Sequence, residues 1–198
     1  MAIAKRKKKF FDVEMPSIHK ETQLQAFEVK ELEGRFIKYD LTRILRGKSI
    51  LLQLEVFVKE DKASAHPREL TIMPYYLKRM VRKGTDYVED SFKTSCKDAE
   101  LQIKPFIVTR RRVSRAVRRA LREKVREELI KYLKSKKKEQ IFEEVLKNRI
   151  QKELSLKLKK IYPLSLCEIK FLKILKNLES SEKAEKSEKS ESKEEKKE

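Results

Sequence analysis

The sequence predicts an α+β protein with a mostly antiparallel sheet, two long C-terminal helices, a final strand and a disordered tail. Before residue 110, apolar and polar residues alternate in several short segments, which is typical of strands buried on one face. After residue 110, apolar residues recur three and four positions apart, which is typical of amphipathic helices. The last twenty residues contain Ser, Glu, Lys and one Ala, a composition that cannot form a core.

A basic arm, residues 1–9, precedes the first predicted strand. The arm carries too little apolar surface to fold alone, so we expect it to order when it meets phosphates. Phe10 and Phe11 follow it; anchoring in the core is favoured for them over stacking on a base. Residues 11–15 then alternate in polarity and end at Pro16, which indicates a strand. Residues 17–31 fit either a turn or an irregular pairing segment.

A second strand is predicted at residues 35–39, with Phe36 and Ile37 as candidates for its inward side. The next residues, 40–45, read as one helical turn that Gly47 closes.

Residues 50–59 show the clearest alternation before the middle of the chain and predict a strand. The polar residues 60–62 then suggest a hairpin turn. The apolar period changes at residues 70–83 and predicts a helix, which Thr71 can cap and whose first turn suits Pro74.

Four cations gather at the end of that predicted helix: Lys78, Arg79, Arg82 and Lys83. A helix dipole favours cations at this end, so solvated charges explain the cluster almost as well as a contact to RNA does. Gly84 ends the helix.

Residues 85–95 and 99–109 read as paired strands joined by a turn at Lys97 and Asp98. Pro105 interrupts the second strand, which must therefore lie at an edge or carry a bulge there. The second strand leads directly into an arginine-rich helix and so fixes where that helix starts.

That helix is predicted over residues 109–133, and it organises the chain. Its first fourteen residues contain seven arginines: Arg110, Arg111, Arg112, Arg115, Arg118, Arg119 and Arg122. The apolar residues among them gather on one side, and Arg111, Arg115, Arg118 and Arg122 fall on the other. Guanidinium groups suit forked contacts to phosphate, so a helix docked on folded RNA or DNA is favoured. A solvated face would need balancing carboxylates, and the first one, Glu123, follows all seven.

A second long helix is predicted around residues 141–154, with an exposed side of mixed charge that is typical of a solvated face. Lysines at positions 157, 159 and 160 extend the basic surface, and Pro163 stops the helix. Residues 164–175 predict a last strand, with a bulge near Cys167 where its apolar register shifts.

Charge is the strongest bulk property of the 198 residues: 51 Lys and Arg against 32 Asp and Glu give +19. The tail, residues 179–198, carries −2, so the remainder carries +21. Such a field favours a polyanion. No apolar run is long enough for a membrane span, which predicts a soluble cytoplasmic protein without a membrane partner. The predicted organisation is the arm, one α+β RNA-binding domain over residues 10–178, and the disordered tail.

Catalytic and metal-binding patterns are weak. His19 and His66 lie in predicted loops without Cys or carboxylate partners at metal-ligand spacing. Cys96 and Cys167 are expected to be reduced and packed. We therefore expect no enzyme activity, no metal, no cofactor and no small-molecule substrate.

Several motifs, taken in order, resemble one family. They are the basic arm before Phe10 and Phe11, Gly34-Arg35 with Asp40-Leu41-Thr42, Glu69-Leu70-Thr71 with Tyr76-Leu77 and Val81-Arg82-Lys83, Val108-Thr109-Arg110-Arg111, and Lys159 to Leu164 followed by Glu168-Ile169-Lys170. The chain resembles, over about residues 5–172, the archaeal and eukaryotic small-subunit ribosomal protein family "S one e", also called "S three a".

The resemblance implies a β-barrel-like core with C-terminal helices. It also implies a place on the platform of the small subunit of the cytoplasmic ribosome, with small-subunit ribosomal RNA and platform proteins as partners. Messenger RNA near the exit would be a further partner.

We expect a structural constituent of the small subunit that supports translation. The alternative is a free-standing architectural or regulatory nucleic-acid-binding protein. The predicted RNA-binding residues are Lys5, Arg6, Lys7, Lys8, Lys9, Lys78, Arg79, Arg82, Lys83, Arg110, Arg111, Arg112, Arg115, Arg118, Arg119 and Arg122.

Overall fold

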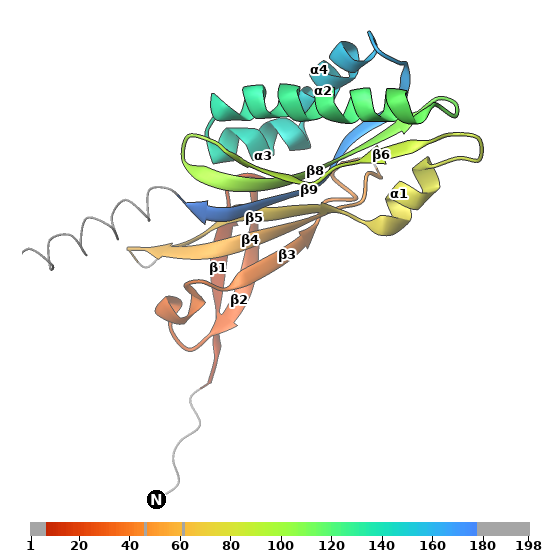
Figure 1. Ribbon diagram of the computed structural model, residues 1–198. Coiled ribbons are helices and arrows are strands. Elements are labelled where there is room, and N and C mark those ends of the chain that lie inside the picture. Colours follow the sequence, from red (N-terminus) through yellow and green to blue (C-terminus); the bar gives the residue numbers. More distant parts are fainter. Residues whose placement is uncertain (1–6, 46, 61, 178–198) are drawn as a thin grey trace, which may run out of the picture. The chain divides into compact units, whose positions relative to one another are not determined.

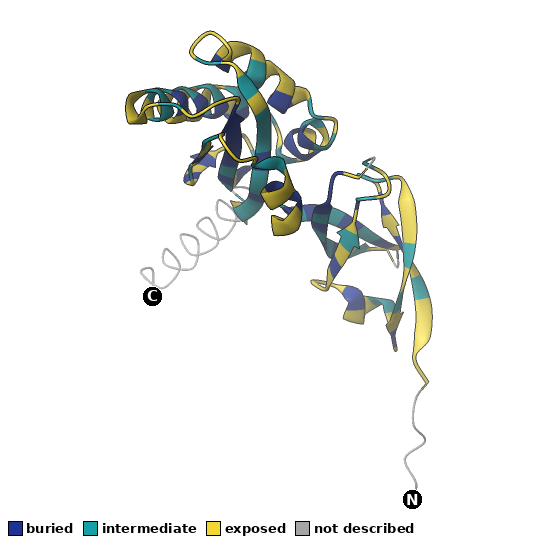
Figure 2. Cartoon of the chain, turned by 90° about the vertical axis from the view of Figure 1, so that its right-hand side faces the viewer, coloured by how far each residue is buried: buried dark blue, intermediate teal, exposed yellow. Residues whose placement is uncertain are grey.

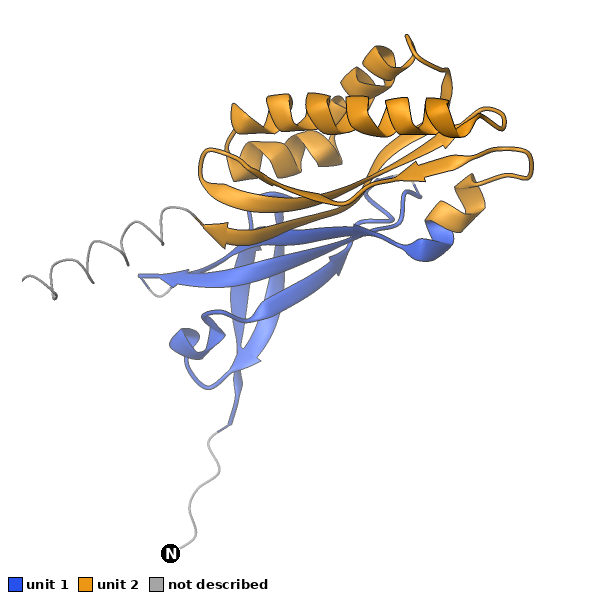
Figure 3. Ribbon diagram, in the orientation of Figure 1, with its two compact units in different colours: residues 1–76 blue, residues 77–198 orange. Residues whose placement is uncertain are grey.

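The computed structural model describes residues 7–45, 47–60 and 62–177, and these contain nine strands and four α-helices. All strand pairs but one within the two units described below are antiparallel, so the predicted α+β class with a mostly antiparallel sheet is confirmed (Figure 1). The chain divides into two compact units, residues 1–76 and residues 77–198 (Figure 3). The predicted arm and tail lie largely or wholly outside the described residues.

Five strands form the first unit as far as it is described. They are β1 (Lys9–Met15), β2 (Lys20–Ala26), β3 (Phe36–Asp40), β4 (Ile50–Lys59) and β5 (Lys62–Ile72), with the 3-10 helix η1 (Val29–Leu32) after β2. Their order is β2-β1-β5-β4-β3, and the β1–β5 pair is parallel. Since β2 and β3 end this series, the strands do not close into the barrel that the family resemblance implied.

The alternation of apolar and polar residues along the sequence corresponds to buried and exposed faces in the predicted strands. Leu52, Leu54 and Val56 of β4 are completely buried, and the intervening side chains are more exposed. The inward side of β3 carries Ile37, whereas Phe36 is 51 % exposed, so that part of the prediction was wrong. Successive side chains of a strand point to opposite faces, so the two neighbours could not both be inward.

The β1–β2 hairpin contains the strand that the sequence left undecided. β2 pairs with β1 along its whole length, from Lys20 opposite Met15 to Ala26 opposite Lys9. Most of its side chains are polar and the hairpin is largely exposed, which explains the weak sequence signal (Figure 2).

Helix α1 (Pro74–Met80) is shorter than the predicted helix over residues 70–83. Thr71 pairs with Leu51 in the β4–β5 ladder, so it does not cap the helix. Pro74 is the first helical residue, as predicted. Strand pairing with β4 therefore overrides the helical pattern before this proline.

Four strands form the sheet of the second unit as described: β6 (Tyr87–Glu89), β7 (Phe92–Ser95), β8 (Ala99–Thr109) and β9 (Leu164–Asn177). β8 pairs with β9 on one side and with β7 and then β6 on the other. Pro105 lies between the stretches of β8 that pair with β7 and β6, and the β9 register shifts there. Of the two alternatives predicted for Pro105, an edge or a bulge, the structure has the bulge.

The last strand also carries the predicted irregularity. The β8–β9 register skips Ser165 and Lys170, on either side of Cys167. Pairing is continuous from Leu166 to Ile169, so the shifts flank the position predicted for the bulge and do not fall at Cys167 itself.

Three helices cover one face of the β6–β9 sheet: α2 (Arg115–Lys134), α3 (Lys138–Leu146) and α4 (Arg149–Leu158) (Figure 1). The buried side of α2 carries an aliphatic residue every fourth position, at Leu121, Val125, Leu129 and Leu133. The second long helix predicted around residues 141–154 was wrong, because Asn148 adopts a left-handed conformation (φ 57°) and separates α3 from α4.

Asn148 gives a test of this helix break. Asn tolerates the left-handed conformation better than residues with branched side chains do. Asn148→Gly should leave the free energy of unfolding within about 0.5 kcal/mol of wild type, and Asn148→Ile should lower it by roughly 1–2 kcal/mol. Urea denaturation measures both. Equal stability of the two variants would contradict the assigned backbone geometry.

Candidate nucleic-acid interface

A hydrogen-bond network centred on Asp86 fixes the chain where β8 ends and α2 begins. The backbone N–H of Thr109 donates to the Asp86 carbonyl oxygen at 2.8 Å. The Asp86 N–H donates to the Thr109 hydroxyl oxygen at 3.1 Å, and the Val113 N–H donates to Asp86 Oδ2 at 2.9 Å. The intervening residues 110–112, here called the arginine loop, are thus held at both ends.

Thr109 adds a further contact inside the arginine loop. Its side chain is completely buried, and its hydroxyl oxygen lies 2.9 Å from the Asp86 carbonyl oxygen and 2.7 Å from that of Arg111. The single hydroxyl proton can be donated to either carbonyl. The backbone of the arginine loop is therefore fixed from within, while its three side chains are exposed.

The same network brings Arg82 and Lys83 close to the arginine loop. Thr85 closes a turn on the Arg82 carbonyl oxygen, to which its N–H donates at 3.2 Å and its hydroxyl at 2.6 Å. Asp86 follows directly. The pair of cations at residues 82–83 and the arginine loop, about thirty residues apart in sequence, therefore lie at the same edge of the second unit.

Helix α2 continues the cationic side chains from the loop. Ser114 precedes the first helical residue with an extended backbone, and its hydroxyl accepts a hydrogen bond from the Val117 N–H at 3.5 Å. Arg115, Arg119 and Arg122 are exposed on the first two turns. The predicted link between strand end and arginine helix is therefore present, although the helix begins six residues later than expected.

Arg118 departs from the predicted outward face. It is half-buried, and its Nε is buried without a hydrogen-bond partner among the described residues. Seven residues make almost two helical turns, so Arg118 lies on the same side as buried Val125. Ala116, expected on the apolar side, is exposed. The buried stripe is therefore rotated relative to the sequence prediction.

One of the seven arginines has a carboxylate partner. Arg119 Nε lies 2.8 Å from Glu123 Oε1, and this hydrogen bond raises the pKa of the arginine. The pair is exposed to solvent, so its contribution to stability is small. Within residues 7–45, 47–60 and 62–177, the other six guanidinium groups form no ion pair.

Charge compensation begins where the arginines end. From residue 123 to 134, three glutamates accompany four cations, whereas residues 110–122 hold seven arginines and no acid. Glu128 lies 2.6 Å from Lys157 and 3.5 Å from Lys124, and the hydrogen bond from Lys157 lowers its pKa. The two halves of α2 therefore differ in charge balance: the first is strongly positive, and the second is nearly neutral.

We use the name cationic surface for the exposed cations of residues 82–83 and 110–122 that have no described carboxylate partner. It consists of Arg82, Lys83, Arg110, Arg111, Arg112, Arg115 and Arg122. The remaining predicted cations of this region, Lys78 and Arg79, are exposed on α1.

The lysines of the N-terminal arm lie in the first unit. Lys7, Lys8 and Lys9 are exposed, Lys9 begins β1, and Lys5 and Arg6 lie outside the described residues. Lys8 Nζ lies 5.7 Å from the centre of the Phe27 ring. Phe10 is 63 % exposed, so its favoured assignment to the core was wrong, whereas Phe11 is half-buried.

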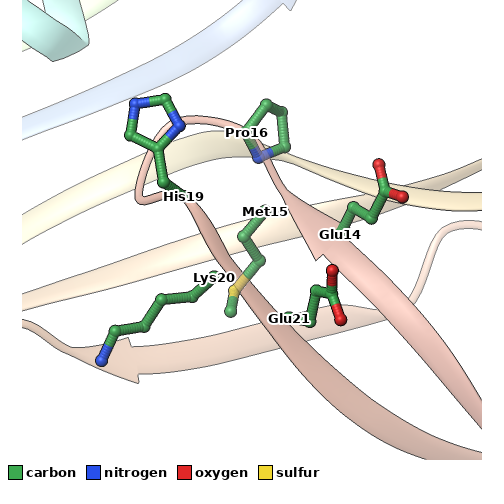
Figure 4. Close-up of a pocket in the computed structure, with 6 residues that line it drawn as sticks. All are labelled: Glu14, Met15, Pro16, His19, Lys20 and Glu21. Atoms are coloured by element: carbon green, nitrogen blue, oxygen red, sulfur yellow. The ribbon is translucent and has the colours of Figure 1, made fainter.

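A hollow at the β1–β2 turn does not suit an anion. Glu14, Met15, Pro16, His19, Lys20 and Glu21 line it (Figure 4). Glu14 and Glu21 stand directly opposite each other across the hairpin, where like charges repel.

The cysteines are packed, as predicted. The Cys96 thiol is buried and donates to the Ala99 carbonyl oxygen at 3.0 Å. Burial raises the pKa of the Cys167 thiol to about 12, so it is protonated at neutral pH.

The described helices include none with the length and apolar character needed to span a membrane.

Sequence reasoning missed the residues that organise this region. Asp86 and Thr109 are a common acid and a common hydroxyl residue, and nothing in their local pattern indicates a shared contact. The available signal was indirect: the predicted pairing of residues 85–95 with residues 99–109 places the start of the first segment opposite the end of the second.

Fold and surface together define the class: a basic α+β protein whose cationic surface suits a polyanion. The sequence profile of the Ribosomal S3Ae family matches residues 4–177. The chain therefore belongs to the Ribosomal S3Ae family, as the motifs indicated. It is a ribosomal protein, and its predicted place in the translation machinery of the cytoplasmic ribosome is confirmed.

A curated relative agrees with this assignment. The chain is 25 % identical over 166 residues to the small ribosomal subunit protein eS1 of Nanoarchaeum equitans (strain Kin4-M). The match covers 80 % of this chain and 84 % of the relative.

The Asp86 network can be tested through stability. Asp86→Ala should lower the free energy of unfolding by roughly 1–3 kcal/mol, because the Val113 N–H loses a charged acceptor. Asp90→Ala is the matched control, since that carboxylate accepts a hydrogen bond from its neighbour Ser91. Chemical denaturation measures both, and an equal effect of the two substitutions would count against the network.

Proposed function

We propose that this chain is a structural protein of the small ribosomal subunit and that it binds small-subunit ribosomal RNA through the cationic surface. The observation that carries this proposal is the absence of carboxylate partners for these seven side chains among the described residues. A polyanion would supply the missing negative charge.

The chemistry of the side chains favours phosphate. Five of the seven are arginines from residues 110–122, and a guanidinium group can donate two parallel hydrogen bonds to phosphate oxygens. Such contacts neutralise and position the RNA backbone without reading its sequence. Specificity would come from the shape of the folded RNA that matches the loop and the first turns of α2.

Fixed geometry supports binding to a preformed RNA shape. Because the Asp86 network holds both ends of the arginine loop, the loop backbone does not have to order on binding. Preorganised groups lose less conformational entropy when they bind. In the first unit, the exposed Lys7, Lys8 and Lys9 would add backbone contacts.

The assignment to the small subunit rests on family membership and on the name of the curated relative. A position on the platform, beside other platform proteins, is proposed from the family resemblance. The role proposed for the chain is structural, since the Asp86 network and helix α2 both serve to hold cationic side chains in place.

Reversing three exposed charges tests the proposal. The variant Arg111→Glu, Arg115→Glu and Arg122→Glu should bind small-subunit RNA at least about tenfold more weakly at physiological salt. The salt dependence of binding should also become shallower, by about one phosphate contact for each arginine. Filter binding at several salt concentrations gives both values. Arg118 is left unchanged because its Nε is buried.

The matched control reverses three exposed cations elsewhere: Lys131→Glu, Arg149→Glu and Lys152→Glu. It changes the net charge by the same amount. If RNA binds at the cationic surface, the first variant should therefore lose more RNA affinity than the control. Both proteins should remain folded.

Wild-type protein should also travel with small subunits through a high-salt wash, whereas a free-standing nucleic-acid-binding protein would not.

A further inference from the structure

One large aromatic side chain is exposed beside the cationic surface. Tyr87 is the first residue of β6 and follows Asp86 directly, and 54 % of it is exposed. It lies opposite Val108 in the β6–β8 ladder, two residues before Arg110. Proteins that bind single-stranded nucleic acid combine cationic side chains with exposed aromatic rings on which bases stack.

The Tyr87 ring is held from one side. It stacks on the ring of Phe106, with a centroid distance of 5.8 Å and an angle of 24° between the ring planes. Phe106 is 3 % exposed, so the supporting ring is part of the core. Offset stacking fixes the orientation of a ring, and here the fixed ring keeps a large exposed area.

The position of Tyr87 relative to the arginine loop follows from the ladder. Paired residues of antiparallel strands have Cα atoms about 5 Å apart, and two further residues add at most about 7 Å. The Cα atom of Arg110 is therefore within about 12 Å of that of Tyr87. Lys83 precedes Tyr87 by four residues in the sequence.

We propose that Tyr87 is a stacking platform for an unpaired base of RNA whose neighbouring phosphates bind the cationic surface. Bases that leave a helix stack on aromatic side chains, and phosphate contacts beside the ring hold the nucleotide in place. The inference rests on the proposed RNA binding and adds the class of RNA: a loop or bulge next to a paired segment.

Phe36, another exposed aromatic residue among the described ones, has different surroundings from Tyr87. Phe36 is 51 % exposed, but the guanidinium carbon of Arg68 lies 5.5 Å from its ring centre. Arg68 in turn pairs with Glu55. Phe36 therefore has nearly the same exposure as Tyr87, a ring face that a cation already covers, and a nearby carboxylate. It is the matched control.

Binding of two RNAs by the full-length protein tests the proposal. One is a blunt RNA duplex, and the other is the same duplex with an internal loop of unpaired adenines. Tyr87→Ala should weaken binding of the looped RNA by about 5- to 100-fold and leave binding of the blunt duplex unchanged. Tyr87→Phe and Phe36→Ala should bind both RNAs as wild type does.

Ultraviolet crosslinking of the wild-type protein to small-subunit RNA, read by mass spectrometry, gives an answer that does not depend on folding of a variant. We expect Tyr87 to crosslink to an unpaired nucleotide. A crosslink map that contains the arginine loop but lacks Tyr87 would overturn the proposal.

The outcomes separate this inference from the proposed function. If the wild-type protein bound neither RNA, the proposed function itself would fail. If it bound both, and Tyr87→Ala weakened neither, the stacking assignment alone would be wrong. Thermal unfolding of each variant shows whether a loss of binding reflects a loss of structure.

Discussion

The cationic surface depends on the hydrogen bonds that join Asp86 to Thr109 and Val113. A loop with three consecutive arginines has little reason to hold one conformation, because its side chains repel each other and bury no apolar area. The carboxylate of Asp86 and the buried hydroxyl of Thr109 supply what the loop lacks. They also join two segments, residues 82–86 and 109–113, that bring cations from different parts of the sequence to one place.

Like charges at this density oppose folding, so something else must stabilise the segment. Neighbouring cations on a helix surface, about 6 Å apart, repel by roughly 0.7 kcal/mol per pair in water. The aliphatic stripe of α2, from Leu121 to Leu133, buries four side chains at about 1.5–3 kcal/mol each. Burial along the C-terminal part of the helix therefore outweighs repulsion in its first turns. The exposed charges remain available to a polyanion.

Most of the sheet could be predicted because alternation is a local signal: β1, β3, β4, β8 and β9 were found within about two residues. β2 was left undecided because its hairpin is largely exposed and polar. The predicted α1 was too long because pairing with β4 acts from outside the segment. The break between α3 and α4 depends on one left-handed residue, Asn148, which a periodic pattern cannot show.

Of the candidate site, the arginines were evident from composition. Their exposure and the burial of Arg118 depend on the rotation of α2 against the sheet, and the Asp86 network depends on side chains that meet after folding.

The central claim is that the arginine loop and the first turns of α2 face RNA. Arginine-directed chemical footprinting with phenylglyoxal measures this directly on the full-length protein, free and bound to small-subunit RNA. We expect five arginines to react readily in the free protein and to be protected in the complex: Arg110, Arg111, Arg112, Arg115 and Arg122. Arg149, which is exposed on the mixed-charge α4, should react equally in both states. Equal reactivity of the loop arginines with and without bound RNA would contradict the account.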